Sequence, residues 1–346
     1  MYIEKNLIRL TENYMKKIII SLLLAVSLLF CGCSCTPETS LGFTSAWNGG
    51  DEPSIGFSEK CVYKVEYVAD FNEDGLNYTV DEQVGEVLEF EYANGVYTTE
   101  LKVLPTTADI KNKESDILTA DVGHVIYLKT TFNITSRFKY GDATEYEEYN
   151  DSIVTEVYFC PVGASYTPIY SKTIASYASV QVLEVPTVEK IEYEKEFYYN
   201  TETYSFDGEE YEKTFKTYID NGQLLFALRN INIEEEGSFA LPTTSIQYGV
   251  PKTLSVSRIS DRALNLSVVN VNGEDIINPA PATKRFTFRL NTTLNAGKEQ
   301  LVYVNNASDF ASSRAVIVRY VAPLGETGSF LNLGAMQYTL TEYTFS

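Results

Sequence analysis

The 346-residue sequence contains one histidine, one tryptophan and five cysteines. A Ser-His-Asp triad would have to use that histidine, His124, which is in phase with Ile126 and Leu128. We therefore expect His124 to be a packed strand residue and not a general base. Zinc sites built from several His and Cys ligands lack the ligands. The sequence also has no glycine-rich phosphate loop and no dinucleotide fingerprint, so no common catalytic motif can be read from it.

Basic residues are scarce, because 27 Lys and Arg stand against 47 Asp and Glu and the net charge is −20. Nucleic-acid binding requires clustered basic side chains that neutralise phosphates, so no nucleic-acid partner is expected. Attraction to an anionic bilayer surface is disfavoured for the same reason. The acidity favours solubility and offers carboxylates to divalent cations.

Long apolar runs are also absent, apart from Ile18–Phe30, which follows Lys16 and Lys17 and precedes Gly32-Cys33. The run has the length of a signal-peptide core and is short for a membrane span. The Gly32-Cys33 junction resembles a lipobox, the site where bacterial lipoproteins are cleaved and acylated. This resemblance implies that residues 1–32 are a signal peptide and that Cys33 carries lipid. The mature chain would then lie outside the cytoplasm, in the cell envelope, anchored to a membrane.

Two alternatives to this interpretation are an ordinary secretory signal cut near Cys35 and an uncleaved anchor. Residues 1–14 have no signal character, so Met15 is the expected true start.

After the signal, residues 33–58 are rich in Gly, Pro, Ser and Thr and predict a flexible tether, with Trp47 docked on the folded part. From Cys61 onward apolar and polar residues alternate, and no segment has a 3.6-residue period over three turns. This pattern predicts an all-β protein with little helix. Because turn signals restart after Pro186, we expect two tandem antiparallel β-sandwich domains, Ig-like or jelly-roll-like, over 59–186 and 187–346.

Dipeptides that favour two-residue hairpin turns separate several of the predicted strands. They are Asn94-Gly95, Asp207-Gly208, Asn221-Gly222 and Asn272-Gly273. Across the third of these turns, Leu224, Phe226 and Leu228 are expected to form one face of a strand.

One acidic segment matches the spacing of a calcium loop. Oxygen ligands at positions 1, 3, 5 and 12, with Gly at position 6, are typical of such loops. The segment resembles the EF-hand or dockerin loop over twelve residues, but Asp81 replaces the bidentate Glu and the flanks are predicted to be strands. The alternative is a hydrated hairpin loop. The candidate calcium ligands are Asp70, Asn72, Asp74, the Leu76 carbonyl and Asp81.

Cys61 and Cys160 lie outside the lipobox. In an oxidising compartment they could form a disulfide, and the alternative is two buried free thiols. The 26 tyrosines are expected mainly to pack across strands, although Tyr140, Tyr146 and Tyr149 could line a sugar-stacking surface.

These observations predict a lipid-anchored bacterial surface or envelope protein with a binding or structural role, such as adhesion or the capture of a glycan or surface protein. The rival prediction is a carboxylate-based glycoside hydrolase or another polysaccharide-acting enzyme. A cleft with two carboxyl groups about 5–10 Å apart would favour the enzyme, whereas a groove lined by tyrosines would favour binding.

Overall fold

The computed structural model describes most of the compact unit Leu41–Ser346. The described residues are 43–48, 50–73, 75–105, 123–162, 165–181, 187–199, 201–212, 219–220, 223–229, 238–244, 251–291, 298–305, 314–324 and 332–346. The expected signal segment, Cys33 and the first part of the expected tether, residues 33–42, lie outside them. The described part is nearly all β, as predicted.

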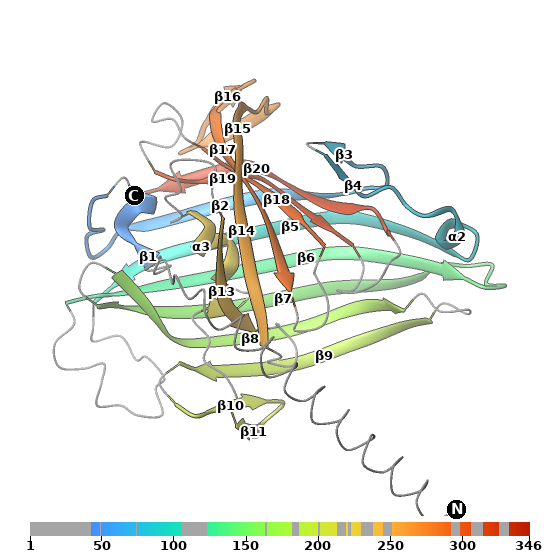
Figure 1. Ribbon diagram of the computed structural model, residues 1–346, viewed down its shortest axis with the longest axis horizontal. Coiled ribbons are helices and arrows are strands. Elements are labelled where there is room, and N and C mark those ends of the chain that lie inside the picture. The colour runs from blue at the N-terminus through green and yellow to red at the C-terminus, as the bar shows by residue number, and fades with distance from the viewer. Residues whose placement is uncertain are drawn as a thin grey trace, which may run out of the picture. The chain divides into compact units, whose positions relative to one another are not determined.

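Five long strands form an antiparallel meander (Figure 1). They are β5 (Leu88–Leu104), β6 (Val125–Tyr140), β7 (Glu147–Val162), β8 (Ser165–Gln181) and β9 (Thr187–Tyr198). Each has the predicted two-residue period. In β6, for example, Ile126, Leu128, Ile134 and Phe138 are buried, and all point to the inner face because successive strand residues point to opposite faces.

The sheet continues from β5 through β2 (Ser58–Val68) to β20 (Ala335–Phe345), and β2 pairs with both neighbours. It then runs through β19 (Ile317–Pro323), β18 (Gln300–Asn305), β17 (Ala282–Asn291), β14 (Pro251–Ala263) and β13 (Ser238–Thr244). In Figure 1, β13 and β14 cross the direction of the long strands steeply. Residues from β14 and β17 belong to the same buried cluster as residues from β5, β6 and β7, so the sheet folds across itself.

Strand pairing does not follow the predicted division at Pro186. β9 lies after this residue and pairs with β8 before it, from Tyr170↔Tyr198 to Gln181↔Thr187. β2 and β20 also pair across it. Strands assigned by sequence to two sandwiches therefore share one sheet.

Short elements complete the unit. They are β1 (Phe43–Thr44), a 3₁₀ turn (Ser45–Asn48), β3 (Asn72–Glu73), β4 (Leu76–Asn77), α2 (Glu82–Gly85), β10 (Thr203–Phe206), β11 (Glu209–Glu212), β12 (Ile219–Asp220), α3 (Leu224–Arg229), β15 (Val268–Val271) and β16 (Glu274–Ile277). β1 pairs with β8, and β15 joins β20 by a short parallel bridge.

Two of the predicted hairpin turns are confirmed and one is wrong. Asp207 and Asn272 have φ of 51° and 50°, and each joins a paired two-strand hairpin. Asn94 also has a positive φ, 55°, but β5 continues through it and its pairing with β6 shifts between Ala93 and Val96. Asn94 therefore lies in a β-bulge, which uses the same left-handed conformation as a turn. Asn221-Gly222 lies outside the described residues.

The predicted strand at Leu224, Phe226 and Leu228 is wrong, because these residues form α3. Ala227 is buried as well, so the segment is apolar on all sides and its alternation carries no information on period. Leucine and alanine favour a helix when packing does not require a strand.

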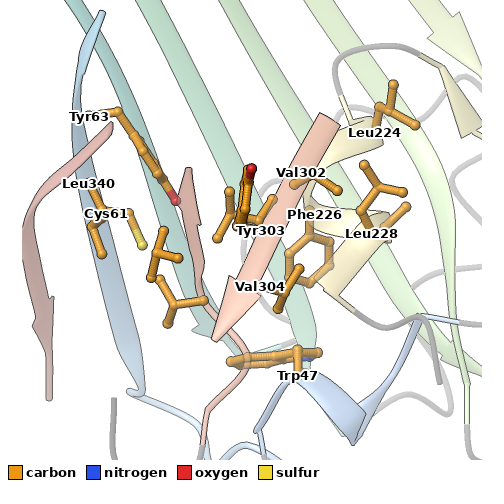
Figure 2. Packing of buried hydrophobic residues seen from close by; sticks show 14 of the residues in the cluster. Trp47, Cys61, Tyr63, Leu224, Phe226, Leu228, Val302, Tyr303, Val304 and Leu340 are labelled. Carbon is orange, nitrogen blue, oxygen red and sulfur yellow. The ribbon is translucent and has the colours of Figure 1, made fainter. Parts of the chain in front are cut away.

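Trp47 confirms the predicted docking. It is fully buried, and its ring lies 5.7 Å from Phe57 and 5.9 Å from Phe226 of α3. Figure 2 shows Trp47 beside α3 and Val304 of β18. The described end of the expected tether therefore packs into the core and is not a free linker.

Candidate functional site

A half-open cavity of about 270 Å³ lies between the long strands β5, β6 and β7 on one side and α3 with β17–β20 on the other. The apolar part of its wall consists of Phe132, Ile153, Leu224, Leu225 and Leu290. α3 contributes Leu224 and Leu225 to this wall.

Tyrosines form the second part of the wall. Tyr320 stands opposite Tyr338 in the β19–β20 ladder, with ring centroids 4.9 Å apart. Tyr97 of β5 meets Tyr338 edge-on at 5.6 Å. Burial raises the pKa of all three hydroxyls. They therefore stay protonated and present neutral donors and acceptors.

The remaining polar groups of the cavity are an amide and two threonine hydroxyls. The Tyr320 hydroxyl donates a hydrogen bond to Oε1 of Gln300, and Thr155 shares a hydrogen bond of 3.1 Å with Thr173. Among the described residues that line this cavity there is no Asp, Glu, His, Cys, Lys or Arg. The described lining therefore offers hydrogen bonds without formal charge.

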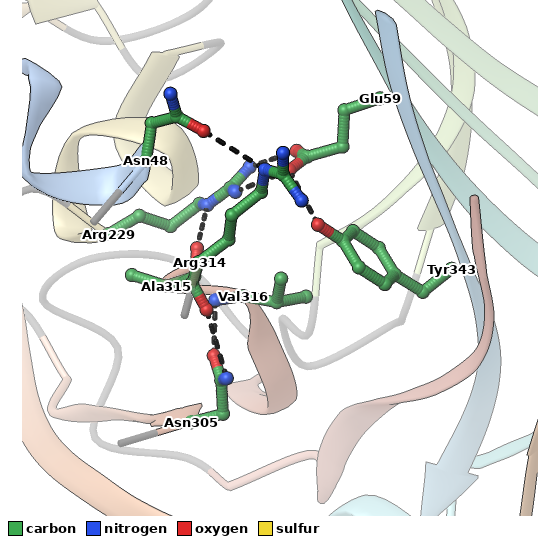
Figure 3. A network of polar contacts seen from close by, with 8 residues as sticks. All are labelled: Asn48, Glu59, Arg229, Asn305, Arg314, Ala315, Val316 and Tyr343. Atoms are coloured by element: carbon green, nitrogen blue, oxygen red, sulfur yellow. Dashed lines mark hydrogen bonds and ion pairs between the residues drawn. The ribbon is translucent and has the colours of Figure 1, made fainter. Parts of the chain in front are cut away.

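A buried ion pair anchors α3 beside the cavity (Figure 3). Arg229, the last residue of α3, binds Glu59 of β2 through both terminal nitrogens, at 2.5 and 2.9 Å. Its Nε donates to the Ala315 carbonyl, and the Tyr343 hydroxyl donates to Glu59 at 3.2 Å. Burial lowers the pKa of Arg229, but the charge and hydrogen bonds of Glu59 outweigh it and the net shift is upward. Both charged groups have partners, and the pair holds the end of α3 against β2.

Cys61 and Cys160 are free, buried thiols, so the predicted disulfide is not formed. Cys61 belongs to the main core, where burial raises its thiol pKa to about 12. Cys160 follows Phe159, a residue of that core, and therefore points to the opposite face of β7. The two thiols thus lie on different faces of the sheet.

Two of the described candidate calcium ligands accept hydrogen bonds from other residues. Asp70 accepts a hydrogen bond of 2.7 Å from the Thr79 hydroxyl, and Asp81 accepts one of 2.7 Å from the Asn332 amide. Asn72 and Leu76 belong to the β3–β4 hairpin, and Asp74 lies outside the described residues. Within the described segments there is no group of three or more His, Cys, Asp or Glu side chains suited to a metal.

Two arginines further disfavour a cation at this loop. Glu73, at position 4, binds Arg262 at 2.7 Å and Arg319 at 3.0 Å. Calcium binding stays a prediction, which is tested by comparing thermal melting in calcium and in EDTA.

The predicted sugar-stacking tyrosines are bound to carboxylates. Tyr146 donates to Glu89 at 3.0 Å. Tyr140 and Tyr149 both donate to Glu147, at 3.3 and 2.8 Å. Tyr149 also packs on Phe138. These contacts favour a packing role for them.

A longer row of tyrosines was not predicted from the sequence. Tyr127, Tyr158, Tyr170 and Tyr198 stand directly opposite one another on β6 to β9. Tyr170 and Tyr198 are only 4% and 7% exposed, so the row is packed and does not form an open platform. The alternating pattern predicts that each tyrosine lies in a strand. Only the register between neighbouring strands shows that the four tyrosines form a row.

His124 is 9% exposed and lies just before β6, with Nε2 3.3 Å from the Tyr166 hydroxyl. It is packed, as predicted.

No protein-family profile matches the chain, and no curated protein matches it. A crystal structure described as a β-barrel-like protein of the domain of unknown function DUF1849, from Brucella abortus, is similar to it with a TM-score of 0.45 and 6% sequence identity. That similarity covers 85% of this chain and 100% of the Brucella chain. Of the helices in the described segments, none has the length and apolar character needed to cross a bilayer.

Proposed function

We propose that this chain is a lipid-anchored envelope protein that binds a ligand in the half-open cavity beside α3. The observation that carries the proposal is the cavity wall of apolar and tyrosine side chains, whose described part holds no carboxylate. A glycoside hydrolase of the common kind requires two carboxyl groups beside the scissile bond. The wall therefore suits capture better than hydrolysis.

The composition of the wall supports this role. Small-molecule sites are mostly apolar and aromatic, with a few polar groups that fix the ligand's orientation. Here Leu224, Leu225 and Leu290 supply the apolar surface, and Gln300 with Tyr338 supplies the polar groups. A volume of about 270 Å³ is close to the lower end of the usual range of ligand pockets, about 300–1,000 Å³.

The proposed anchor is Cys33, from its lipobox-like sequence context. Residues 33–42 would join the lipid to β1 and span at most about 35 Å when fully extended. The binding body would therefore stay close to the membrane surface.

Filling the cavity tests the binding role. Leu225 of α3 lines the cavity, so Leu225→Trp should fill part of it and abolish binding to an array of envelope lipids and glycans. Ile174→Trp is the matched control, because Ile174 is 50% exposed on β8. If Leu225→Trp binds the same array components as wild type, the cavity is not the binding site.

Metabolic labelling with an alkyne fatty acid tests the anchor. Wild type should incorporate the label, and Cys33→Ala should lose it and accumulate as a precursor. Unchanged labelling of the variant would place the acylated residue elsewhere.

A further inference from the structure

We propose that the cavity selects an uncharged ligand with an apolar body and one hydrogen-bond acceptor, and that Gln300 and Tyr338 recognise the acceptor. This inference rests on the binding function proposed above and adds the chemical class of the ligand. It follows from which polar groups of the wall are already engaged and which are not.

The first observation is the neutrality of the wall. Its described residues are apolar, hydroxyl or amide side chains. A charged ligand would lose its hydration on entering and would find no opposite charge there, which is a large penalty. Arg229 lines the adjoining pocket together with Tyr97 and Leu225, and its charge is paired with Glu59 at 2.5 Å. The cavity therefore disfavours both anions and cations.

The second observation is an unused amide. Gln300 of β18 accepts the Tyr320 hydroxyl at Oε1. Its Nε2 carries two N–H donors, and these have no partner among the described residues. Because Gln300 lines the cavity, the free donors are available to a bound molecule.

The third observation is an unused hydroxyl. Tyr338 is held by ring contacts with Tyr320 at 4.9 Å, Tyr97 at 5.6 Å and Phe132 at 6.2 Å. Its hydroxyl makes no hydrogen bond to any described residue. Tyr338 thus presents a fixed, protonated donor in the cavity.

The arrangement of the strands supports one shared acceptor. Gln300, Tyr320 and Tyr338 lie on the consecutive strands β18, β19 and β20, and Tyr320 contacts both others. A carbonyl oxygen has two lone pairs and accepts two donors at once. The ligand class that fits is a small apolar molecule carrying a ketone, ester or amide carbonyl.

Three probes of similar size test this selection. Acetophenone has an apolar ring and a carbonyl, α-methylstyrene has a CH₂ group in place of the carbonyl oxygen, and benzoate carries a negative charge. Binding is measured by saturation-transfer difference NMR on the full chain in lipid nanodiscs, with empty nanodiscs as the blank. We expect acetophenone to bind about fivefold more tightly than α-methylstyrene, since an uncharged hydrogen bond contributes about 0.5–1.5 kcal/mol. Benzoate should bind most weakly.

Side-chain variants then test the two residues. Gln300→Met and Tyr338→Phe keep the shape of the wall and remove the donors. Each should weaken acetophenone binding severalfold and leave α-methylstyrene unchanged. The matched controls are Gln83→Met, at an exposed position of α2, and Tyr146→Phe, at a residue that is 37% exposed. These control variants should change the binding of neither probe.

The outcomes separate the two proposals. If both neutral probes bind equally, and are both lost in Leu225→Trp, the cavity binds ligands but the carbonyl selection is wrong. Tighter binding of benzoate would also overturn the selection. If no probe binds wild type and Leu225→Trp leaves the binding array unchanged, the binding function itself is wrong.

Discussion

At the scale of single residues, the bulge in β5 depends on the small size of Gly95. A Cβ atom on Gly95 would lie 2.4 Å from the Val65 carbonyl oxygen and 2.8 Å from the Val65 Cβ. Gly95→Ala should therefore force β2 and β5 apart and lower the free energy of unfolding by about 1–3 kcal/mol. Gly85→Ala is the matched control, because nothing lies within 4 Å of its added Cβ. Urea denaturation measures both variants, and equal midpoints would contradict the steric argument.

Single residues also differ in how far sequence could predict them. Asp207-Gly208 and the docked Trp47 have strong local signals, and both were predictable. Gln300 and Tyr338 have none, because their role depends on the register of β18, β19 and β20 and on which neighbouring groups are already bonded. Asn94 shows the intermediate case: its positive φ was predictable, but whether it makes a turn or a bulge is decided by pairing with β6.

At the scale of elements, α3 is attached to the sheet by the Arg229–Glu59 pair, whose side chains are 6% and 1% exposed. Arg229→Met would leave Glu59 buried and unpaired, and should lower the free energy of unfolding by about 3–5 kcal/mol. Adding Glu59→Leu should recover part of this loss, because the two residues are coupled. Chemical denaturation of both single variants and the double variant measures the coupling.

An exposed ion pair serves as the control for this cycle. Lys190 and Glu192 lie 2.5 Å apart with side chains 55% and 63% exposed, so Lys190→Met should change stability by less than about 1 kcal/mol. If the effect of the Arg229–Glu59 double variant were the simple sum of the two single effects, the proposed coupling between these residues would be contradicted.

Asp151 holds three strands together where β7 and β8 separate. Its carboxylate accepts the Ser136 hydroxyl at 2.8 Å and the Ala178 amide at 2.9 Å. Burial raises the pKa of Asp151, although both hydrogen bonds lower it. In the window above its ordinary pKa the folded state therefore holds more protons than the unfolded chain, and this group's contribution to stability falls as pH rises.

Asp151→Asn tests this pH dependence. The amide cannot ionise but can still accept from Ala178 and donate to Ser136. The difference in melting temperature, variant minus wild type, should therefore be more positive at pH 7 than at pH 4. A difference that stays constant with pH, or that favours the variant more at pH 4, would contradict the assignment. This carboxyl had no signal in the sequence beyond its place in a strand.

At the scale of the whole molecule, the all-β class was predictable from two-residue periodicity, but the arrangement of the strands was not. Periodicity shows which face of a strand is apolar and does not identify its neighbour. The pairing of β2 with β20, and of β8 with β9 across Pro186, is therefore information that local sequence does not contain.

This pairing leads to a fragment experiment. A chain of residues 187–346 would leave β20 without β2 and β9 without β8, with two long edges unpaired. We expect it to aggregate or to give collapsed amide NMR spectra, whereas the full chain folds. A soluble fragment with dispersed amide peaks would restore the two-domain division.

The pairing of β2 with β20 also limits the order in which the strands of the molecule can fold. Glu59 pairs with Phe345, so this ladder joins segments almost as far apart in sequence as the described chain allows. Contacts between such distant segments make folding slow. During synthesis β2 is made long before β20. One edge of β2 therefore stays unpaired until the residues of β20 have been made. The yield of native protein should then depend on how long that edge is shielded from other chains, more than on the final stability of the sheet.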